Sequence, residues 1–184
     1  NSPFVQEQAR ALAAQTEGLF EEVHLILNAT NIWLVSHPAE DPRHSAEFAL
    51  YVDAIRSYWN GLIDLGVLTR KGELYSIPAK RDSFERIVLG QNYFSAQLDP
   101  MTRGFLIEQA VRDDSNVLAI PVSYPLLADS PLAATVAFVR LSGLDALYGR
   151  FLPASGGTIS LFNSDGIILA HSPLDENLIG MRFG

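Results

Sequence analysis

The same short hairpin pattern occurs twice in the sequence, and this repeat constrains the fold more than any other feature. The first copy, DLGVLTRKGELYSIP, covers residues 64–78, and the second, TISLFNSDGIILAHSP, covers residues 158–173. In each copy an apolar run enters a glycine-containing turn and a second apolar run leaves it, which is typical of two antiparallel strands. The second copy follows the linker-like stretch PASGG. We therefore expect it to begin a second, related module.

A single long helix is predicted at the N-terminus, over residues 3–36. Ser2 is a suitable N-cap, and Pro3 suits the first helical position. Apolar or small side chains then alternate at spacings of four and three, at Val5, Ala9, Leu12, Thr16, Leu19, Val23, Ile26, Thr30 and Trp33. Such a seam indicates that one side of the helix packs against a partner. Two interpretations stay open: the helix covers its own core, or it is a stalk that also pairs with its copy in a homodimer.

The middle of the chain predicts a second helix and further strands. A polar loop with two prolines at residues 37–44 leads to a helix that begins near Ser45. Strands are expected at residues 62–69, 73–77, 105–111, 117–123 and 133–141, with a short helix in GQNYFSAQL and another that begins at Ser142. Strands joined by hairpins, with the helices gathered to one side, favour an α+β fold with an antiparallel, PAS-like sheet.

Three segments follow from these boundaries. Residues 1–41 are the long helix and its loop, residues 42–152 are a PAS-like module, and residues 153–184 are the truncated start of a second PAS-like module. The chain starts with asparagine and shows no signal peptide, so we expect it to be a piece of a longer protein.

Composition excludes several classes of function. The net charge is −8 and no cluster of lysine and arginine is present, which argues against a nucleic-acid partner. The absence of cysteine excludes disulfides, thiolate metal sites and thiol catalysis. No apolar run approaches the roughly 20 residues that span a bilayer.

Four segments, taken in order, resemble a known family. They are LGVLTRKGELYSIP, LGQNYF, AATVAFVRLSGLDALYGRF and GTISLFNSDGIILAHSPLDENLIGMRF. Together with the long first helix they resemble the double Cache (PDC) family, the extracytoplasmic sensor domains of bacterial membrane receptors. The resemblance implies two PAS-like modules stacked beside one helix, outside the inner membrane. It also implies a cytoplasmic output domain elsewhere in the protein, such as a histidine kinase, a diguanylate cyclase or a chemoreceptor module.

The resemblance also implies where a ligand would bind. The family's pocket segment corresponds to Gln91, Tyr93 and Phe94. Amino-acid-binding members resemble one another in an arginine that clamps the ligand carboxylate and an aspartate that receives its ammonium. Here Gln91 occupies the arginine position, and Arg140 lies nearest the aspartate position. We therefore expect a small anionic ligand, such as a carboxylate, or no small ligand, rather than an α-amino acid bound in the family's usual way.

Three further residues, Tyr75, Ser123 and Tyr124, are weaker candidates for the same pocket. The alternative for the aromatic pair Tyr93 and Phe94 is that it anchors an irregular segment on the sheet. The alternative for Arg140 is that it pairs with a carboxylate or lies on an exposed part of the sheet, because a charge in an apolar strand needs a partner or solvent.

No catalytic, cofactor-binding or metal-binding motif is predicted. GxSxG, HExxH, the P-loop and GxGxxG are all missing from the sequence. The loop after the first helix holds potential metal ligands at His37, Glu40, Asp41 and His44. Because prolines break this segment, we expect a solvated loop there rather than a zinc site. His24 is expected on the surface of the helix. The predicted function is ligand sensing, with a ligand-free dimerisation or spacer module as the alternative and an enzyme as a remote one.

Overall fold

The computed structural model describes residues 3–77, 86–112, 116–152 and 156–183. Four helices lie in these ranges: α1 (Pro3–Ser36), α2 (Ala46–Tyr58), α3 (Asn92–Leu98) and α4 (Leu141–Gly149). The strands are β1 (Ile63–Thr69), β2 (Glu73–Ser76), β3 (Arg86–Ile87), β4 (Leu106–Ile107), β5 (Val111–Arg112), β6 (Leu118–Pro125), β7 (Leu132–Arg140), β8 (Ile159–Phe162) and β9 (Ile168–Ser172).

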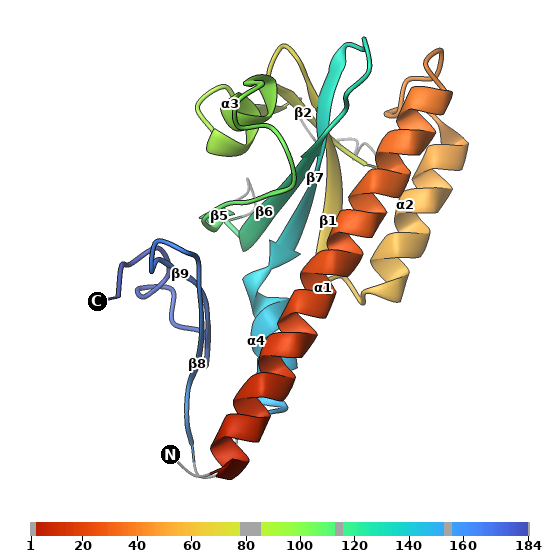
Figure 1. The fold of residues 1–184 in the computed structure, drawn as a ribbon. Coiled ribbons are helices and arrows are strands. Elements are labelled where there is room, and N and C mark those ends of the chain that lie inside the picture. The colour runs from red at the N-terminus through yellow and green to blue at the C-terminus, as the bar shows by residue number, and fades with distance from the viewer. Residues whose placement is uncertain (1–2, 78–85, 113–115, 153–155, 184) are drawn as a thin grey trace.

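Seven strands form one antiparallel sheet in the order β3-β2-β1-β7-β6-β4, with β5 also pairing with β6. Helices α1 and α2 pack on one face of this sheet, and α3 packs on the other, against β6 and β7 (Figure 1). Helix α4 continues directly from β7. The long N-terminal helix and the antiparallel sheet confirm the predicted α+β, PAS-like fold class.

The register of the sheet decides which side chains share a face. Tyr75, Val67, Thr135 and Tyr124 form one row across β2, β1, β7 and β6. Directly paired residues point to the same side of a sheet. Thr135 donates its hydroxyl hydrogen to Oδ1 of Asn31 on α1, at 2.6 Å. The whole row therefore faces α1, and the alternate residues of these strands face α3.

Helix α1 has the predicted bounds and uses most of its seam inside its own domain. The buried apolar side chains of α1 are Leu19, Phe20, Val23, Leu27 and Leu34. Leu12, Ile26 and Trp33 are half-buried against the same core. Near the N-terminus, however, Val5 is 56% exposed and Ala9 is exposed. From Leu12 onward the helix is thus a core-covering helix, and its first turns extend beyond the sheet (Figure 1).

Two polar contacts tie α1 to the rest of the fold. The Asn31 amide donates to the carbonyls of Tyr124 and Pro125, at 3.3 and 3.1 Å. Nearer the N-terminus, the hydroxyls of Thr16 and Tyr148 on α4 lie 2.9 Å apart. Buried polar groups need partners, so these contacts explain why polar residues are tolerated on the buried side of the helix.

The predicted strand at residues 105–111 is wrong, because two shorter strands, β4 and β5, replace it. Ile107 pairs with Val122, and Val111 pairs with Ala119. The segment from Ile107 to Val111 is therefore one residue longer than the part of β6 that it faces. An extra residue on one strand interrupts regular pairing, as in a β-bulge. Strand β3 was not predicted, and the rest of the segment before it lies outside the described residues.

The second hairpin forms a separate two-stranded sheet from β8 and β9. It lies beside α4 at the lower end of the molecule (Figure 1). Leu169 and Ala170 join the main core, and Ser172 donates its hydroxyl hydrogen to Oδ1 of Asp145 on α4, at 2.7 Å. Part of the linker PASGG, residues 153–155, lies outside the described residues. The division into two modules stays a prediction.

Candidate functional site

Helix α3, which covers one face of the sheet, carries the aromatic pair predicted for the pocket. Helix α3 begins after Gln91, whose extended backbone occupies the N-cap position. Tyr93 is buried and meets Phe138 of β7 edge-to-face, with ring centroids 6.0 Å apart. Phe94 is also buried, and it packs beside Gly72 in the first hairpin turn. This packing matches the anchoring alternative, since both rings hold α3 on the sheet.

Ser123 lies on the same face and is fully buried. Gln97 of α3 donates from Nε2 to the Ser123 hydroxyl and to the Gly104 carbonyl, both at 2.7 Å. The amide of Gly104 in turn donates to Oε1 of Gln97, at 3.1 Å. The buried Gln97 therefore fixes the segment after α3 to the sheet through Ser123.

A charged cluster, Arg56, Asp64 and Arg140, lies at the end of this face. Arg140 is two residues beyond Phe138 on β7, and Asp64 of β1 is the direct partner of Phe138, so both belong to the α3 face. Arg140 donates from Nε to Oδ2 of Asp64 at 2.8 Å, and its Nη2 lies 2.6 Å from the same oxygen. Arg56, at the end of α2, approaches Oδ1 of Asp64 from the other side, at 3.3 Å.

The cluster joins two guanidinium groups through Asp64, and Nη1 of Arg56 also lies 3.5 Å from Oδ1 of the more exposed Asp53. Side-chain exposure is 28% for Asp64, 33% for Arg56 and 39% for Arg140, so water screens the charges only in part. Arg56 also donates to the carbonyl of Ile77 at 2.9 Å. Within the described part of the chain, Nη1 of Arg140 has no hydrogen-bond partner. Guanidinium groups bind carboxylates and phosphates through paired N–H donors, so the cluster can accept an anion.

Tyr75 and Tyr124, the weaker candidates for the pocket, lie on the other face of the sheet from Phe138, which contacts Tyr93. Both lie in the row that faces α1. The Arg43 guanidinium lies over the Tyr75 ring, 4.3 Å from its centroid. The Tyr124 ring lies 4.8 Å from the ring of His24. The sequence could not separate the two faces because strand parity depends on a register that only the folded sheet defines.

His24 also differs from its predicted place on the surface. Its imidazole stacks on Phe105, with centroids 4.3 Å apart and planes inclined by 12°. With Tyr124 on its other side, His24 is half-buried between α1 and the sheet. The reason is that the segment before β4 crosses beside α1 and covers a position that a helix in isolation would expose.

Sequence reasoning missed Asp64, Arg56 and Phe138. The signal for Asp64 was present, because it is a charge within an apolar strand, the same property that singled out Arg140. Antiparallel pairing then brings the two side chains together, although they are 76 positions apart in the sequence. No comparable signal marks Arg56, which reaches Asp64 from the end of α2.

A cleft of about 740 Å³ lies between α1, the end of α2 and α4, and Arg140 is at its edge. Its lining includes Gln15, Glu22, Tyr58, Trp59, Leu62, Arg140, Gly143, Leu147 and Arg150. The cleft joins polar and aromatic walls, as small-molecule sites do. The cleft borders the charged cluster at Arg140, so a ligand bound to the cluster has room to extend into the cleft.

Three groups have shifted pKa values, and each shift has a structural cause. Burial raises the pKa of Tyr148, while its hydrogen bond with Thr16 acts in the opposite direction. Burial also raises the pKa of Glu108. The hydrogen bond from Arg43 lowers the pKa of Asp41. None of these groups belongs to the cluster of Arg56, Asp64 and Arg140.

Three solved structures with a similar fold come from signalling receptors. The chain matches "Methyl-accepting Chemotaxis protein X" with a TM-score of 0.69 at 14% identity, over 97% of this chain and 76% of that one. It matches the ligand-binding domain of the Pseudomonas fluorescens chemoreceptor CtaA, in complex with L-alanine, with a TM-score of 0.68 at 16% identity, over 97% and 74%. The extracellular domain of rpHK1S-Z16, described as a histidine kinase, gives 0.59 at 21% identity, over 93% and 76%. This is a Cache-type fold.

This fold confirms the resemblance to the double Cache family that the sequence motifs indicated. No protein-family model and no curated protein matches the sequence, so the likeness lies in the structure. By their names, these three neighbours are a chemotaxis protein, a chemoreceptor and a histidine kinase. Among the described helices, none combines the length and apolar character required to cross a membrane.

Proposed function

We propose that this chain is the extracytoplasmic ligand-sensing domain of a transmembrane signalling receptor. The observation that carries the proposal is the Cache-type fold, which the ligand-binding domains of chemoreceptors share, with a charged cluster on the α3 face of its sheet. Residues 153–184 would begin a second, membrane-proximal module. This segment would bind and not catalyse, and any enzymatic output would reside in another domain of the full protein.

The ligand class proposed is a small anion, in particular a carboxylate. Arg56 is shared between Asp53 and Asp64, whereas within the described residues Arg140 pairs with Asp64 through Nε and Nη2, which leaves its Nη1 for a ligand. A guanidinium held by one carboxylate is preorganised for a second acceptor, which lowers the entropic cost of binding. The bound L-alanine of the Pseudomonas neighbour supports a small-molecule ligand. Gln91, near the start of α3, is proposed to contribute a neutral contact.

Strand β7 links the proposed site to the long helix. Arg140 at the end of β7 lines the cleft, and Thr135 of the same strand bonds to Asn31 of α1. A ligand that favours one position of β7 would therefore favour one position of α1. Such a bias is effective only when the ligand binds the two arrangements with different affinity.

Thermal-shift screening followed by calorimetry tests the site. A panel of carboxylates, amino acids, polyamines and sugars is compared on the wild type and on Arg140→Gln. We expect a carboxylate to raise the Tm of the wild type and to bind at least about tenfold more weakly to R140Q, since a charged hydrogen bond is worth about 1.5–3 kcal/mol. Arg150→Gln is the matched control, because Arg150 lines the same cleft outside the cluster.

Two results would reject parts of this proposal. A ligand whose affinity is unchanged in R140Q and in Gln91→Ala would bind elsewhere, so the proposed site would be wrong. A complete lack of binding across the panel would instead favour a ligand-free spacer or dimerisation module.

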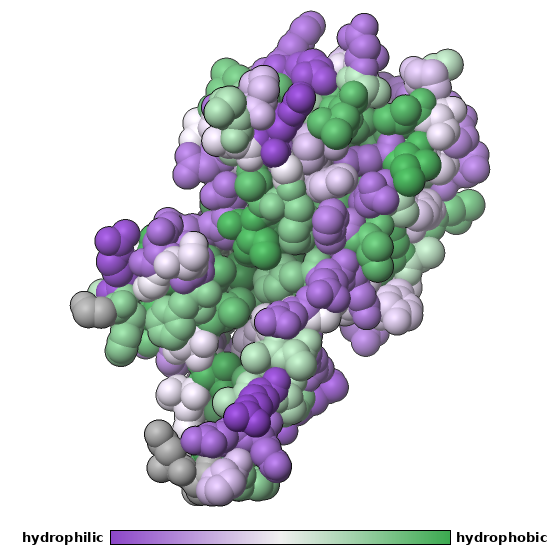
Figure 2. Space-filling model, viewed as in Figure 1, coloured by the Kyte–Doolittle hydropathy of each residue, from purple (hydrophilic) through white to green (hydrophobic). Residues whose placement is uncertain are grey.

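We further propose that the chain forms a homodimer through α1. The predicted seam is largely used within the domain, but a second heptad stripe lies on the helix, exposed at Phe4, Ala11, Leu25 and Ile32 and half-buried at Gly18. Leu25 is 67% exposed and borders an apolar groove of about 430 Å³ between α1 and α2. Figure 2 shows apolar side chains that interrupt the polar surface over the upper part of these helices. A seven-residue repeat of this kind suits pairing with a second helix.

Sedimentation velocity of the wild type and the double variant Leu25→Glu/Ile32→Glu tests the dimer. We expect a concentration-dependent dimer for the wild type and a monomer for the variant. Leu50→Glu is the control, because Leu50 is an exposed apolar residue on α2 outside the stripe. If L50E dissociates the dimer as strongly as the double variant, the interface is not the α1 stripe.

A further inference from the structure

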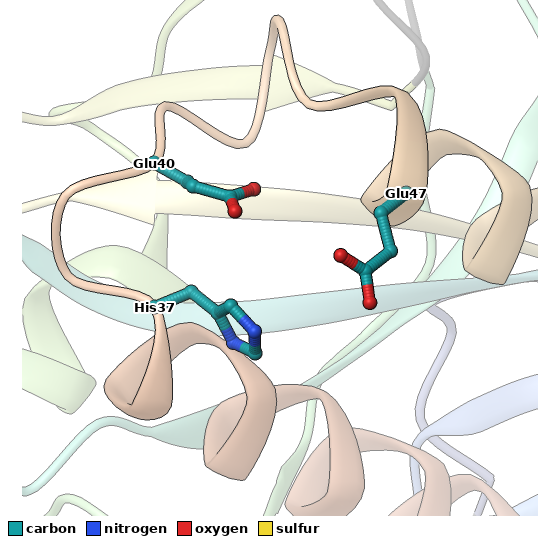
Figure 3. A group of neighbouring side chains, drawn as sticks. All are labelled: His37, Glu40 and Glu47. Atoms are coloured by element: carbon teal, nitrogen blue, oxygen red, sulfur yellow. The ribbon is translucent and has the colours of Figure 1, made fainter.

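The loop that joins α1 to α2 brings three potential metal ligands together. They are His37 after the end of α1, Glu40 in the loop and Glu47 in the first turn of α2. One ligand atom from each residue lies within 4.8 Å of the others. Figure 3 shows the imidazole and the two carboxylates arranged around a common space. The sequence predicted a solvated loop here because prolines break the segment, and Glu47 was not among the candidate ligands.

The imidazole of His37 is fixed in the form that a metal requires. Its Nδ1 lies 2.8 Å from the carbonyl oxygen of Trp33. A carbonyl can only accept, so Nδ1 carries the hydrogen and the neutral ring keeps its lone pair on Nε2. The ring also stacks on the Trp33 indole, with centroids 4.1 Å apart and planes inclined by 13°. A backbone carbonyl that holds the second nitrogen is the usual support of a metal-binding histidine.

The carboxylate of Glu40 is placed by a hydrogen bond, and that of Glu47 by its position in the first turn of α2. Oε2 of Glu40 accepts a hydrogen bond from the Ser45 hydroxyl at 2.8 Å, and Ser45 is also the N-cap of α2. Glu47 follows two residues later in that helix. The two carboxylates lie close together, and like charges at short distance repel unless a cation lies between them. Ser45 thus couples the position of Glu40 to the start of the helix that carries Glu47.

The other two candidates of the loop are not members of this group. Asp41 is bound by Arg43, whose Nη2 lies 2.8 Å from Oδ2 of Asp41 and whose backbone amide donates to Oδ1 at 2.9 Å. His44 does not belong to the group of converging ligand atoms found among the described residues. Only His37 and Glu40 of the four predicted candidates therefore meet, and they do so with Glu47.

We propose that His37, Glu40 and Glu47 bind a divalent transition-metal ion of the zinc class. One imidazole nitrogen with two carboxylate oxygens suits zinc, whereas magnesium and calcium prefer all-oxygen sites. Three protein ligands leave a fourth position for water or for a group from a partner. The ion would clamp the end of α1 to the start of α2. This inference does not rest on the proposed ligand-sensing function.

Isothermal titration of the untagged, full chain with ZnCl₂ tests the proposal. We expect one zinc ion per chain, a Tm that rises with zinc concentration, and no displacement by excess Mg²⁺ or Ca²⁺. His37→Gln and Glu47→Gln should each weaken zinc binding more than about tenfold, because each removes one of three ligands. Both positions are at least partly exposed, so neither substitution should unfold the chain.

His44→Gln is the matched control, since His44 is an exposed histidine of the same loop. The site is supported if H44Q binds zinc as tightly as the wild type while H37Q and E47Q lose zinc affinity. No zinc binding by the wild type would overturn the proposal. Equal weakening in H44Q, or undiminished binding in E47Q, would also overturn it, because zinc would then bind through scattered surface histidines.

Discussion

At the scale of single residues, Asn31 is the most connected polar side chain between α1 and the sheet. It is buried, donates to two carbonyls at the end of β6, and accepts from Thr135. Asn31→Ala leaves these groups without their partner, so we expect unfolding to require about 2–3 kcal/mol less free energy. Chemical denaturation measures the change. Asn28→Ala, on the exposed side of the same helix, should change stability by less than about 0.5 kcal/mol, and a comparable loss there would contradict the assignment.

Glu108 gives a residue-level prediction for pH. Burial raises the pKa of Glu108 above its ordinary value of 4.5, so the charged form is disfavoured in the folded chain. As the pH rises above about 4.5, the unfolded chain loses this proton more readily than the folded chain does. The folded state therefore becomes less stable relative to the unfolded state as the pH rises. We therefore expect Glu108→Gln to be slightly more stable than the wild type at pH 7 and not at pH 4. Denaturant midpoints at both pH values measure this, and an equal gain at pH 4 would exclude ionisation as the cause.

Residue types in the sequence identified charged and aromatic candidates, but not their neighbours. Arg140 was singled out because a charge interrupts an apolar strand, and one of its three interpretations, pairing with a carboxylate, describes its contact with Asp64. The identity of that partner depends on the register of β1 against β7. The face on which Tyr75 and Tyr124 lie depends on the same register, because a shift of one residue reverses the side to which every side chain points.

At the scale of elements, the two hairpins depend on glycines with left-handed backbones. Gly72 has φ +84° and Gly166 has φ +76°. We expect Gly72→Ala and Gly166→Ala each to cost about 1–2 kcal/mol of stability, because L-residues are strained there. A Cβ on Gly72 would also meet the Leu89 side chain, but Leu89 is exposed and can move aside. Asn at either position should cost less than Ala, since Asn tolerates this backbone. Thermal unfolding measures these effects.

The control for the glycine series is Gly18→Ala in α1, where a Cβ would meet nothing within 4 Å. Because alanine favours a helix over glycine, this change should stabilise the chain by about 0.5–1 kcal/mol. If the hairpin variants gain stability as G18A does, their glycines are not required by the turns.

Elements marked by strong local signals were predictable, and elements set by long-range contacts were not. The periodic helix over residues 3–36 and both glycine turns have the predicted positions, and its predicted cap, Ser2, lies outside the described residues. The strand expected at residues 105–111 is divided because β6, a distant segment, offers one residue fewer for pairing. The heptad seam correctly indicated that α1 packs along one side. It could not tell that this side, from Leu12 onward, faces the chain's own sheet.

At the scale of the whole molecule, the second hairpin is a small sheet attached to the main domain through α4. The hydroxyl of Ser172 in β9 bonds to Asp145 of α4, and Leu169 and Ala170 extend the main core to this sheet. A two-stranded sheet is marginally stable alone, so its order must come from this attachment. The cleft and the second sheet therefore both border α4.

Asp145→Ala tests whether the second sheet opens separately from the main one. We expect faster amide hydrogen exchange in β8 and β9, with β1, β6 and β7 unchanged, because local opening requires only the contacts of the small sheet to break. Asp165→Ala is the control, since Asp165 lies in the turn of the same hairpin and away from α4. If exchange rises equally in both sheets of D145A, they unfold as one cooperative unit, and the second sheet is part of the main domain and not the start of another module.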